Sequence, residues 1–234
     1  MSTDLRIKFS RKGPAKYLGH LDNMRYFQKA ILRAGINIKY SEGFNPHQIL
    51  SFAYPLGVSM ETEGDYADIT VETFESTDDV KDKLNSVMNE GFSIENVSVV
   101  PEDALNAMAS VALADYKIYI DSDIDNDDVV NYLLQPTILF EKENKKEKKS
   151  KKKNNNEKER ETVFVDIKPG IVKLEYNDNY LFMSLISGSS NNIKPISIIE
   201  TLQNFTHKQI KINNIVRVEI YRAVENNKYV PLYF

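Results

Sequence analysis

The residues of this chain best suited to catalysis or specific binding are two histidines, one of which ends a turn stiffened by a proline. His20 begins the sequence His-Leu-Asp, and His47 ends the sequence Ser-Glu-Gly-Phe-Asn-Pro-His. Gly43 permits backbone conformations that other residues resist, and Pro46 keeps the residue before it extended. The turn is therefore expected to hold the side chains of Asn45 and His47 in fixed directions.

The chemistry open to these side chains is proton transfer on phosphate or ribose groups. Imidazole titrates near neutral pH, and an amide offers both a donor and an acceptor. If His20 and His47 converge, they form an acid–base pair, and His20, His47 and Asn45 are then the candidate catalytic residues. The same side chains could instead only hydrogen-bond the turn to a helix. Two histidines without a third ligand make a poor metal site, so we expect no metal and no cofactor.

Basic residues gather around the first predicted helix, which runs from about Leu21 to Ala34. On an ideal helix Arg25, Lys29 and Arg33 lie close together. They form a basic ridge that begins with Asp22. The predicted phosphate- or RNA-binding residues are this ridge, the cations before it and one aromatic residue that could stack on a base: Lys8, Arg11, Lys12, Lys16, Arg25, Lys29, Arg33 and Phe44. A solvated helix face explains the ridge equally well.

Charge is segregated along the chain, although the net charge is only −4. Residues 1–50 carry nine Lys/Arg and three Asp/Glu, whereas residues 51–140 carry three and nineteen. Residues 141–160 carry ten Lys/Arg and five Asp/Glu. A polyanion is expected to approach the first segment and avoid the second.

Composition excludes several classes of protein. The chain has no cysteine, so it cannot form disulfides, use a thiol nucleophile or hold an iron–sulfur cluster through cysteine. No signal-peptide pattern and no apolar run of about 20 residues is found, so we expect a cytoplasmic protein that does not cross a membrane. Walker A, Rossmann and nucleophile-elbow motifs are also missing.

Periodicity predicts an α+β fold made of two tandem ferredoxin-like (βαββαβ) modules. In residues 1–101 alternation predicts strands near 5–9, 49–56, 67–74 and 94–99, with helices after His20 and Ser76. Residues 102–113 are expected to form a linker helix. Residues 114–234 are expected to repeat the order with an extended hairpin, in which residues 144–161 are a disordered basic insertion. That insertion is either a flap on RNA or a tolerated surface loop.

Several local motifs carry a resemblance to a known family. They are His20-Leu-Asp, Arg33-Ala-Gly, Tyr40-Ser-Glu-Gly-Phe-Asn-Pro-His, Ser51-Phe-Ala and Asp65-Tyr-Ala-Asp. Over residues 5–70 the chain resembles the radical SAM-linked proteins, a bacterial family of unknown function. The resemblance implies a protein encoded beside a radical SAM enzyme or fused to its C-terminus. It also implies a gene neighbourhood with ribonuclease G and ribosomal proteins, which points towards RNA.

Three functions remain open from the sequence. The first is an RNA-binding accessory protein that recruits a structured RNA substrate for a radical SAM partner, in RNA modification or processing. The second is a metal-independent RNA-processing or modifying enzyme that uses His20 and His47. The third is a protein-only scaffold whose acidic segment, residues 51–140, docks a basic partner.

Overall fold

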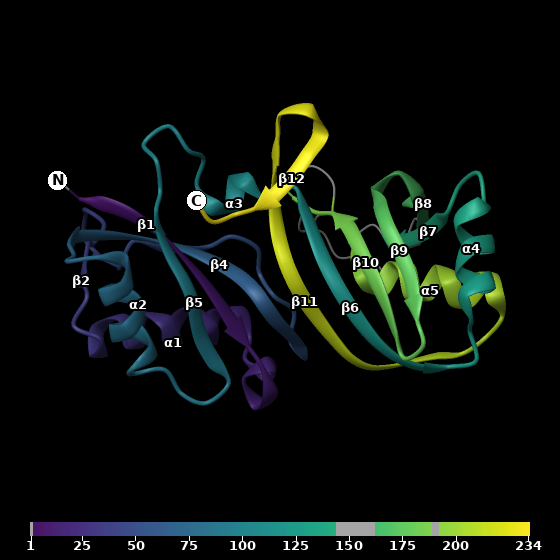
Figure 1. Ribbon diagram of the computed structural model, residues 1–234, viewed down its shortest axis with the longest axis horizontal. Coiled ribbons are helices and arrows are strands. Elements are labelled where there is room, and N and C mark those ends of the chain that lie inside the picture. The colour runs from purple at the N-terminus through teal and green to yellow at the C-terminus, as the bar shows by residue number, and fades with distance from the viewer. Residues whose placement is uncertain (1, 144–161, 189–191) are drawn as a thin grey trace, which may run out of the picture.

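The computed structural model describes residues 2–143, 162–188 and 192–234, so the predicted basic insertion at 144–161 lies outside the described residues. Most of the chain builds one mixed sheet of ten strands, in the order β5-β1-β4-β11-β6-β10-β9 along its main path (Figure 1). The α+β class predicted from the sequence is therefore confirmed. The division into two ferredoxin-like modules stays a prediction.

The N-terminal half of the sheet comes from residues 2–101. Its elements are β1 (Thr3–Arg11), the 3-10 turn η1 (Gly13–Tyr17), α1 (His20–Arg33), β2 (Asn37–Ile38), β3 (Leu50–Phe52), β4 (Met60–Thr73), α2 (Thr77–Asn85) and β5 (Phe92–Val99). β1 pairs antiparallel with both β4 and β5, while β2 and β3 pair antiparallel with β4. The observed strands match the predicted ones except that β3 is shorter and β4 begins earlier.

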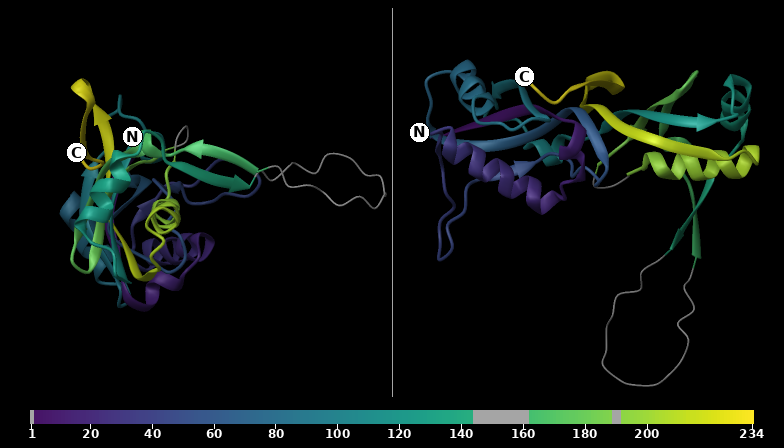
Figure 2. Two further views of the ribbon diagram at one scale, coloured as in Figure 1. Left: turned by 90° about the vertical axis from the view of Figure 1, so that its right-hand side faces the viewer. Right: turned by 90° about the horizontal axis from the view of Figure 1, so that it is seen from below.

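The C-terminal half follows a single-turn helix, α3 (Ala107–Ser110), where a longer linker helix was expected. Its elements are β6 (Leu113–Ser122), α4 (Asn126–Leu134), β7 (Leu139–Glu143), β8 (Thr162–Asp166), η2 (Lys168–Gly170), β9 (Ile171–Asn177), β10 (Tyr180–Ile186), α5 (Pro195–Thr206), β11 (Ile210–Val224), η3 (Glu225–Asn227) and β12 (Lys228–Pro231). β7 and β8 pair only with each other, as a ribbon that leaves the main sheet (Figure 2).

Local signals explain most of the helix ends. Gly35 has a φ of 67° directly after α1, the left-handed conformation that glycine adopts most readily. The Ser76 side chain accepts a hydrogen bond from the Asp79 N–H at the start of α2, and Asp125 does the same for α4. Within α1, Leu21 is exposed although it is apolar, whereas Asn23 is buried.

Helices cover one face of each half of the sheet. Phe27 and Ile31 of α1 and Leu84 of α2 pack on apolar side chains of β1, β4 and β5. In the C-terminal half, α4 and α5 pack on the inward residues of β6 and β10. The right-hand view of Figure 2 shows α1 and α5 on the same side of the strands. One continuous sheet thus carries helices from both halves on the same side.

The two halves meet where β4 and β11 pair in parallel, a junction called the seam below. Ile215 lies opposite Met60 and Arg217 lies opposite Thr62. A side chain at Gly64 would place its Cβ 2.7 Å from the backbone carbonyl oxygen of Val218. The strands therefore approach one another so closely that only a glycine fits there.

On the helix-covered side of the seam lies a buried ion pair. The Arg217 Nη2 donates to the Asp65 carboxylate at 2.6 Å, and both side chains are almost fully buried. Burial raises the pKa of Asp65, while the neighbouring Arg217 and Arg11 guanidiniums act against that rise. The seam therefore depends on charges that compensate one another away from water.

On the opposite side of the seam a second polar cluster joins three strands. The Glu219 carboxylate of β11 accepts hydrogen bonds from Lys8 Nζ of β1 at 2.5 Å and from Tyr66 Oη of β4 at 2.6 Å. Beside it, the buried Arg6 guanidinium donates to both carboxylate oxygens of Asp68, at 2.8 and 3.0 Å. Arg6 also donates to the backbone carbonyl of Leu232, which ties the C-terminal segment to β1.

We expect the Asp65→Ala variant to lose about 3–5 kcal/mol of unfolding free energy, because it leaves a buried guanidinium without its carboxylate. Urea denaturation followed by circular dichroism measures the change. The Asp65→Leu, Arg217→Met double variant removes both charges and should lose less than Asp65→Ala alone. As a control, Asp22→Ala breaks an exposed pair 3.5 Å long and should cost about 1 kcal/mol or less. Equal losses for Asp65→Ala and Asp22→Ala would contradict a stabilising role for the buried pair.

Candidate functional site

The turn that carries His47 is closed by its own hydrogen bonds. The backbone N–H of Ser41 donates to the His47 carbonyl at 2.8 Å, and the His47 N–H donates to Ser41 Oγ at 3.1 Å. The same hydroxyl lies 2.8 Å from His47 Nδ1. Gly43 has a φ of 113°, which only glycine adopts without strain. These contacts fix the direction of the His47 side chain, whereas the Asn45 side chain has no hydrogen-bond partner among the described residues.

The turn rests on α1 and leaves a hollow beside the helix. Gln48 Nε2 donates to the Gln28 carbonyl of α1 at 3.1 Å, which anchors the end of the turn. The hollow, called the α1 hollow below, has a volume of about 340 Å³. It is lined by Arg25, Gln28, Lys29, Leu32, Tyr40, Pro46, His47 and Gln48. The structure thus brings two of the predicted cations together with one of the predicted histidines.

The cations of α1 differ in what they contact. Arg25 makes only a long contact, 3.5 Å, with the exposed Asp22, and Lys29 has no polar partner in the part of the chain that the structure describes. Arg33 donates to the Val87 carbonyl at 3.1 Å and so helps to hold the segment that follows α2. Arg25 and Lys29 are therefore the cations of this helix most open to a ligand.

Three further predicted residues lie near the tip of the turn or at the start of α1. Phe44 is fully exposed, and Asn45 is exposed beside it. His20 begins α1, where its ring meets the edge of Phe52 at a centroid distance of 5.8 Å. Gln28, which borders the α1 hollow, lies about 12 Å further along the helix axis, at ~1.5 Å per residue. His20 is thus not among the residues that line the hollow with His47.

The predicted lysines before α1 pair with carboxylates of the sheet. Lys12 pairs with Glu63 at 3.3 Å, Lys16 pairs with Glu61 at 3.5 Å, and Lys8 pairs with Glu219 as described above. The carboxylates come from β4 and β11, far away in sequence. Lys8 and Lys16 are therefore largely buried in ion pairs within the fold, which the local sequence cannot show, whereas Lys12 stays exposed in its pair.

Among the predicted phosphate-binding residues, Arg11 differs most from its prediction. Its side chain is buried, and its guanidinium donates to the carbonyls of Leu18, Gly57 and Met60 at 3.1, 3.3 and 3.2 Å. Burial lowers the pKa of Arg11, Asp65 raises it, and the nearby Arg217 lowers it further. Arg11 therefore offers nothing to a ligand on the outer surface, although it lies directly behind a cavity.

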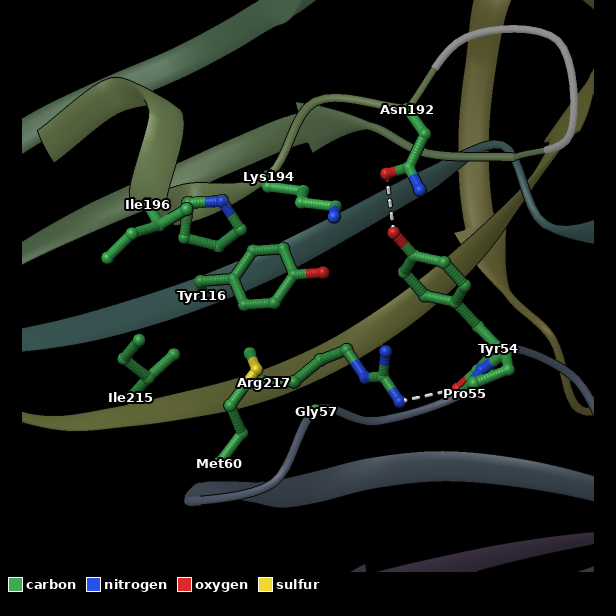
Figure 3. Close-up of a pocket in the computed structure, with 11 residues that line it drawn as sticks. Tyr54, Pro55, Gly57, Met60, Tyr116, Asn192, Lys194, Ile196, Ile215 and Arg217 are labelled. Carbon is green, nitrogen blue, oxygen red and sulfur yellow. Dashed lines mark hydrogen bonds between the residues drawn. The ribbon is translucent and has the colours of Figure 1, made fainter. Parts of the chain in front are cut away.

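That cavity, which the sequence does not indicate, lies at the seam and has a volume of about 480 Å³. It is called the seam cavity below. Its polar side chains are Tyr54, Tyr116, Asn192, Lys194 and Arg217. Figure 3 shows the Tyr116 hydroxyl, the Lys194 ammonium and the Arg217 guanidinium all directed towards the space in front of the Tyr54 ring. A charged residue at an inward strand position, such as Arg217 in Val-Arg-Val, was the one signal that could have suggested it.

The geometry around Arg217 is well defined. Its Nη2 donates to the Tyr54 carbonyl at 2.8 Å as well as to Asp65, and its Cζ lies 4.8 Å from the centre of the Tyr54 ring. The Tyr54 hydroxyl donates to the Asn192 side-chain carbonyl at 2.5 Å. Burial raises the pKa of Tyr116, so this hydroxyl stays protonated at neutral pH.

A third feature is an aromatic group on the open face of the C-terminal half. Tyr119 of β6 lies directly opposite Tyr180 of β10, with ring centroids 5.7 Å apart. Phe182 follows on β10, and Lys173 Nζ of β9 lies 5.2 Å from the centre of its ring. Neighbouring residues of β6 and β10 point the other way, into the core under α4 and α5. The aromatic group therefore lies on the face that these helices leave uncovered, towards the viewer in Figure 1.

The described residues hold neither a metal-ligand cluster nor a helix suited to a bilayer. In residues 2–143, 162–188 and 192–234, no group of three or more His, Cys, Asp or Glu side chains is placed to hold a metal ion. None of the helices in these ranges combines the length and the apolar composition needed to cross a bilayer.

Comparison with known proteins gives a family but no activity. Curated proteins gave no match. Among solved structures, the chain is similar to the crystal structure of an unknown protein from Galdieria sulphuraria, at 11% identity over 91% of this chain and 98% of that one, with a TM-score of 0.26. So low a TM-score carries no argument. Residues 4–195 match the family described as an uncharacterized protein conserved in bacteria (DUF2344), and the chain therefore belongs to that family.

Proposed function

We propose that this protein is an RNA-binding accessory protein that recruits an RNA substrate for a radical SAM enzyme. The observation that supports it best is the α1 hollow, where Arg25 and Lys29 lie beside the rigid turn that carries His47. A guanidinium and an ammonium suit the phosphate groups of a nucleic acid. The turn adds groups that can contact bases.

The exposed tip of the turn supports RNA over a simple anion. Phe44 is fully exposed although it is apolar, and Asn45 and His47 beside it offer hydrogen-bonding edges. Single-stranded RNA is recognised by stacking of bases on aromatic side chains and by hydrogen bonds to base edges. A phosphate on Arg25 and Lys29 would leave a neighbouring base within reach of this tip.

The aromatic group on the C-terminal half offers a second contact. RNA-binding sheets of four strands commonly stack two or three bases on aromatic residues of their open face. Tyr119, Tyr180 and Phe182 occupy that kind of position, with Lys173 beside them. An RNA that spans both surfaces would cover a larger area than either surface provides alone.

We propose that each half is a ferredoxin-like module, and the antiparallel orders β5-β1-β4-β3 and β11-β6-β10-β9 support this. In such a module the helices cover one face of the sheet and leave the other free. The aromatic group lies on that free face of the second module.

The choice of a radical SAM enzyme as the partner is inferred from the family resemblance. A radical SAM enzyme holds its cluster through cysteines, and this chain has none. The chemistry would therefore belong to the partner, while this chain positions the RNA. The alternative of an RNA-processing enzyme is less favoured, because His20 does not line the α1 hollow that His47 borders.

The first test is a charge reversal in the α1 hollow. We expect Lys29→Glu to weaken the binding of a structured RNA about tenfold or more, and the Arg25→Glu, Lys29→Glu double variant to weaken it further. Filter binding at several salt concentrations measures the affinity. The slope of log affinity against log salt should fall by ~0.7 for each phosphate group that a variant no longer neutralises.

A matched control separates this site from general electrostatics. Lys228→Glu on β12 changes the net charge by the same amount, at an exposed position away from α1. It should leave affinity within about threefold of the unchanged protein, since distant surface charges are largely screened at physiological salt. If both variants weaken binding equally, or if the unchanged protein binds no RNA, the α1 hollow is not an RNA site.

The second test addresses the aromatic group. Tyr119→Ala should weaken RNA binding by ~1–3 kcal/mol if a base stacks on this ring, whereas the salt dependence should stay the same. Val172→Ala, at an exposed position of β9, is the control for a small apolar truncation on this part of the sheet. An affinity that Tyr119→Ala leaves unchanged would restrict the RNA site to the α1 hollow.

A further inference from the structure

The seam cavity is separate from the surfaces assigned to RNA above. Its walls come from the segment before β4, from β6, from β11 and from the start of α5, so both halves of the chain contribute. Its volume of about 480 Å³ falls within the ~300–1,000 Å³ of small-molecule sites. A cavity that needs both halves exists only when the seam is formed.

The buried charges around this cavity do not balance. Arg11 and Arg217 are each 1% exposed, and Asp65, at 3% exposed, pairs with Arg217 and is near enough to raise the pKa of Arg11. Arg11 reaches only carbonyl oxygens, two of which belong to Gly57 and Met60 in the cavity wall. One buried positive charge is therefore left without a counter-ion among the described residues.

The hydrogen bonds of the two arginines are also incomplete. The Nε atoms of both Arg217 and Arg11 are buried and have no partner in the described part of the chain. Arg217 lines the cavity directly, with Nη2 committed to Asp65 and to the Tyr54 carbonyl. A buried guanidinium donor without an acceptor is costly, so negative charge held in the cavity close to Arg217 would offset that cost.

Two more features favour negative charge at the same place. α5 starts at the cavity with Pro195, and its N-terminus carries the partial positive charge of a helix dipole. Lys194, which directly precedes α5, directs its ammonium into the cavity (Figure 3) and has no polar partner among the described residues. Together with Arg217 this makes three sources of positive potential around one space.

The remaining walls are apolar. They consist of Pro55, Met60, Pro195, Ile196 and Ile215, with the Tyr54 ring on one side. A bare inorganic anion would leave these walls in contact with water. A ligand with an apolar or flat body beside its anionic group would bury them and gain from the hydrophobic effect.

We propose that the seam cavity binds a small organic anion, with a phosphate or carboxylate group at Arg217, Lys194 and Tyr116 and an apolar or aromatic body against Pro55, Met60 and Ile215. The Tyr116 hydroxyl donates to the anion, and the ammonium of Lys194 closes over it. The body stacks beside Tyr54. Because the ligand touches both halves, it also stabilises the seam.

The test uses simple probes with the full-length protein. Phenyl phosphate and benzoate present the two anionic groups on the same ring, benzyl alcohol is the neutral analogue, and inorganic phosphate lacks the ring. Isothermal titration calorimetry should give dissociation constants of about 1 mM or below for at least one aromatic anion. Benzyl alcohol and inorganic phosphate should each bind about tenfold more weakly or worse. The tighter of the two aromatic anions identifies the head group.

Two conservative variants locate the site. Lys194→Gln removes the exposed ammonium, and Tyr116→Phe removes only a hydroxyl; each should weaken the preferred anion about tenfold. Lys228→Gln, an equal loss of charge on β12, should not change the affinity. Lys194→Gln should also leave RNA affinity unchanged. A failure of the anion-binding proposal therefore does not decide the RNA-binding proposal, and the reverse also holds. The thermal unfolding temperature should rise with the anion present in the unchanged protein and not in Lys194→Gln.

The proposal is overturned if neither aromatic anion shows binding at a concentration of about 10 mM, because an affinity weaker than this does not indicate a specific site. It is equally overturned if benzyl alcohol binds as tightly as the anions, because the cavity is then purely apolar. Unchanged affinity in both Lys194→Gln and Tyr116→Phe would place any binding elsewhere on the molecule.

Discussion

The Asp65–Arg217 pair is the interaction on which the rest of the structure depends. It joins β4 of one half to β11 of the other beside a parallel contact of only a few residues, so little backbone pairing holds the seam. On the opposite face of the sheet, Glu219 joins the same strands through Tyr66 and also binds Lys8. Buried charges need fixed partners, so both clusters specify one arrangement of the halves.

The segregation of charge along the sequence looks different once the chain is folded. The basic segment, residues 1–50, lies beside acidic β4, and Lys12 and Lys16 pair with Glu63 and Glu61. Much of the local positive charge is therefore neutralised within the fold. What stays available is concentrated on α1, where Arg25 and Lys29 have no strong partner among the described residues. Residues 1–50 thus present a smaller and more defined basic surface in the fold than their sequence suggests.

Local features of the fold could be predicted because their causes lie within a few residues. The extended conformation of β1, the cap of Ser76 on α2 and the left-handed Gly35 after α1 each follow from neighbouring side chains. The role of Arg11 could not be predicted in the same way. Its guanidinium binds Gly57 and Met60, more than 40 residues away, and its burial follows from the register of β1 against β4. Likewise, His20 packs against Phe52 at the start of α1 and does not line the hollow that His47 borders, which spacing in the sequence alone does not reveal.

The seam also explains why the cavity escapes sequence reasoning. Its polar groups are supplied by Tyr54, Tyr116, Lys194 and Arg217, which lie in four separate segments and come together only when β4 and β11 pair. A ligand that binds this assembled state and not the separated halves stabilises the seam by mass action. Because α1 and α5 lie on the same side of one continuous sheet, a more stable seam also fixes the α1 hollow relative to the C-terminal half. An RNA that touches both halves would then bind a surface already in place, so less ordering would oppose its binding.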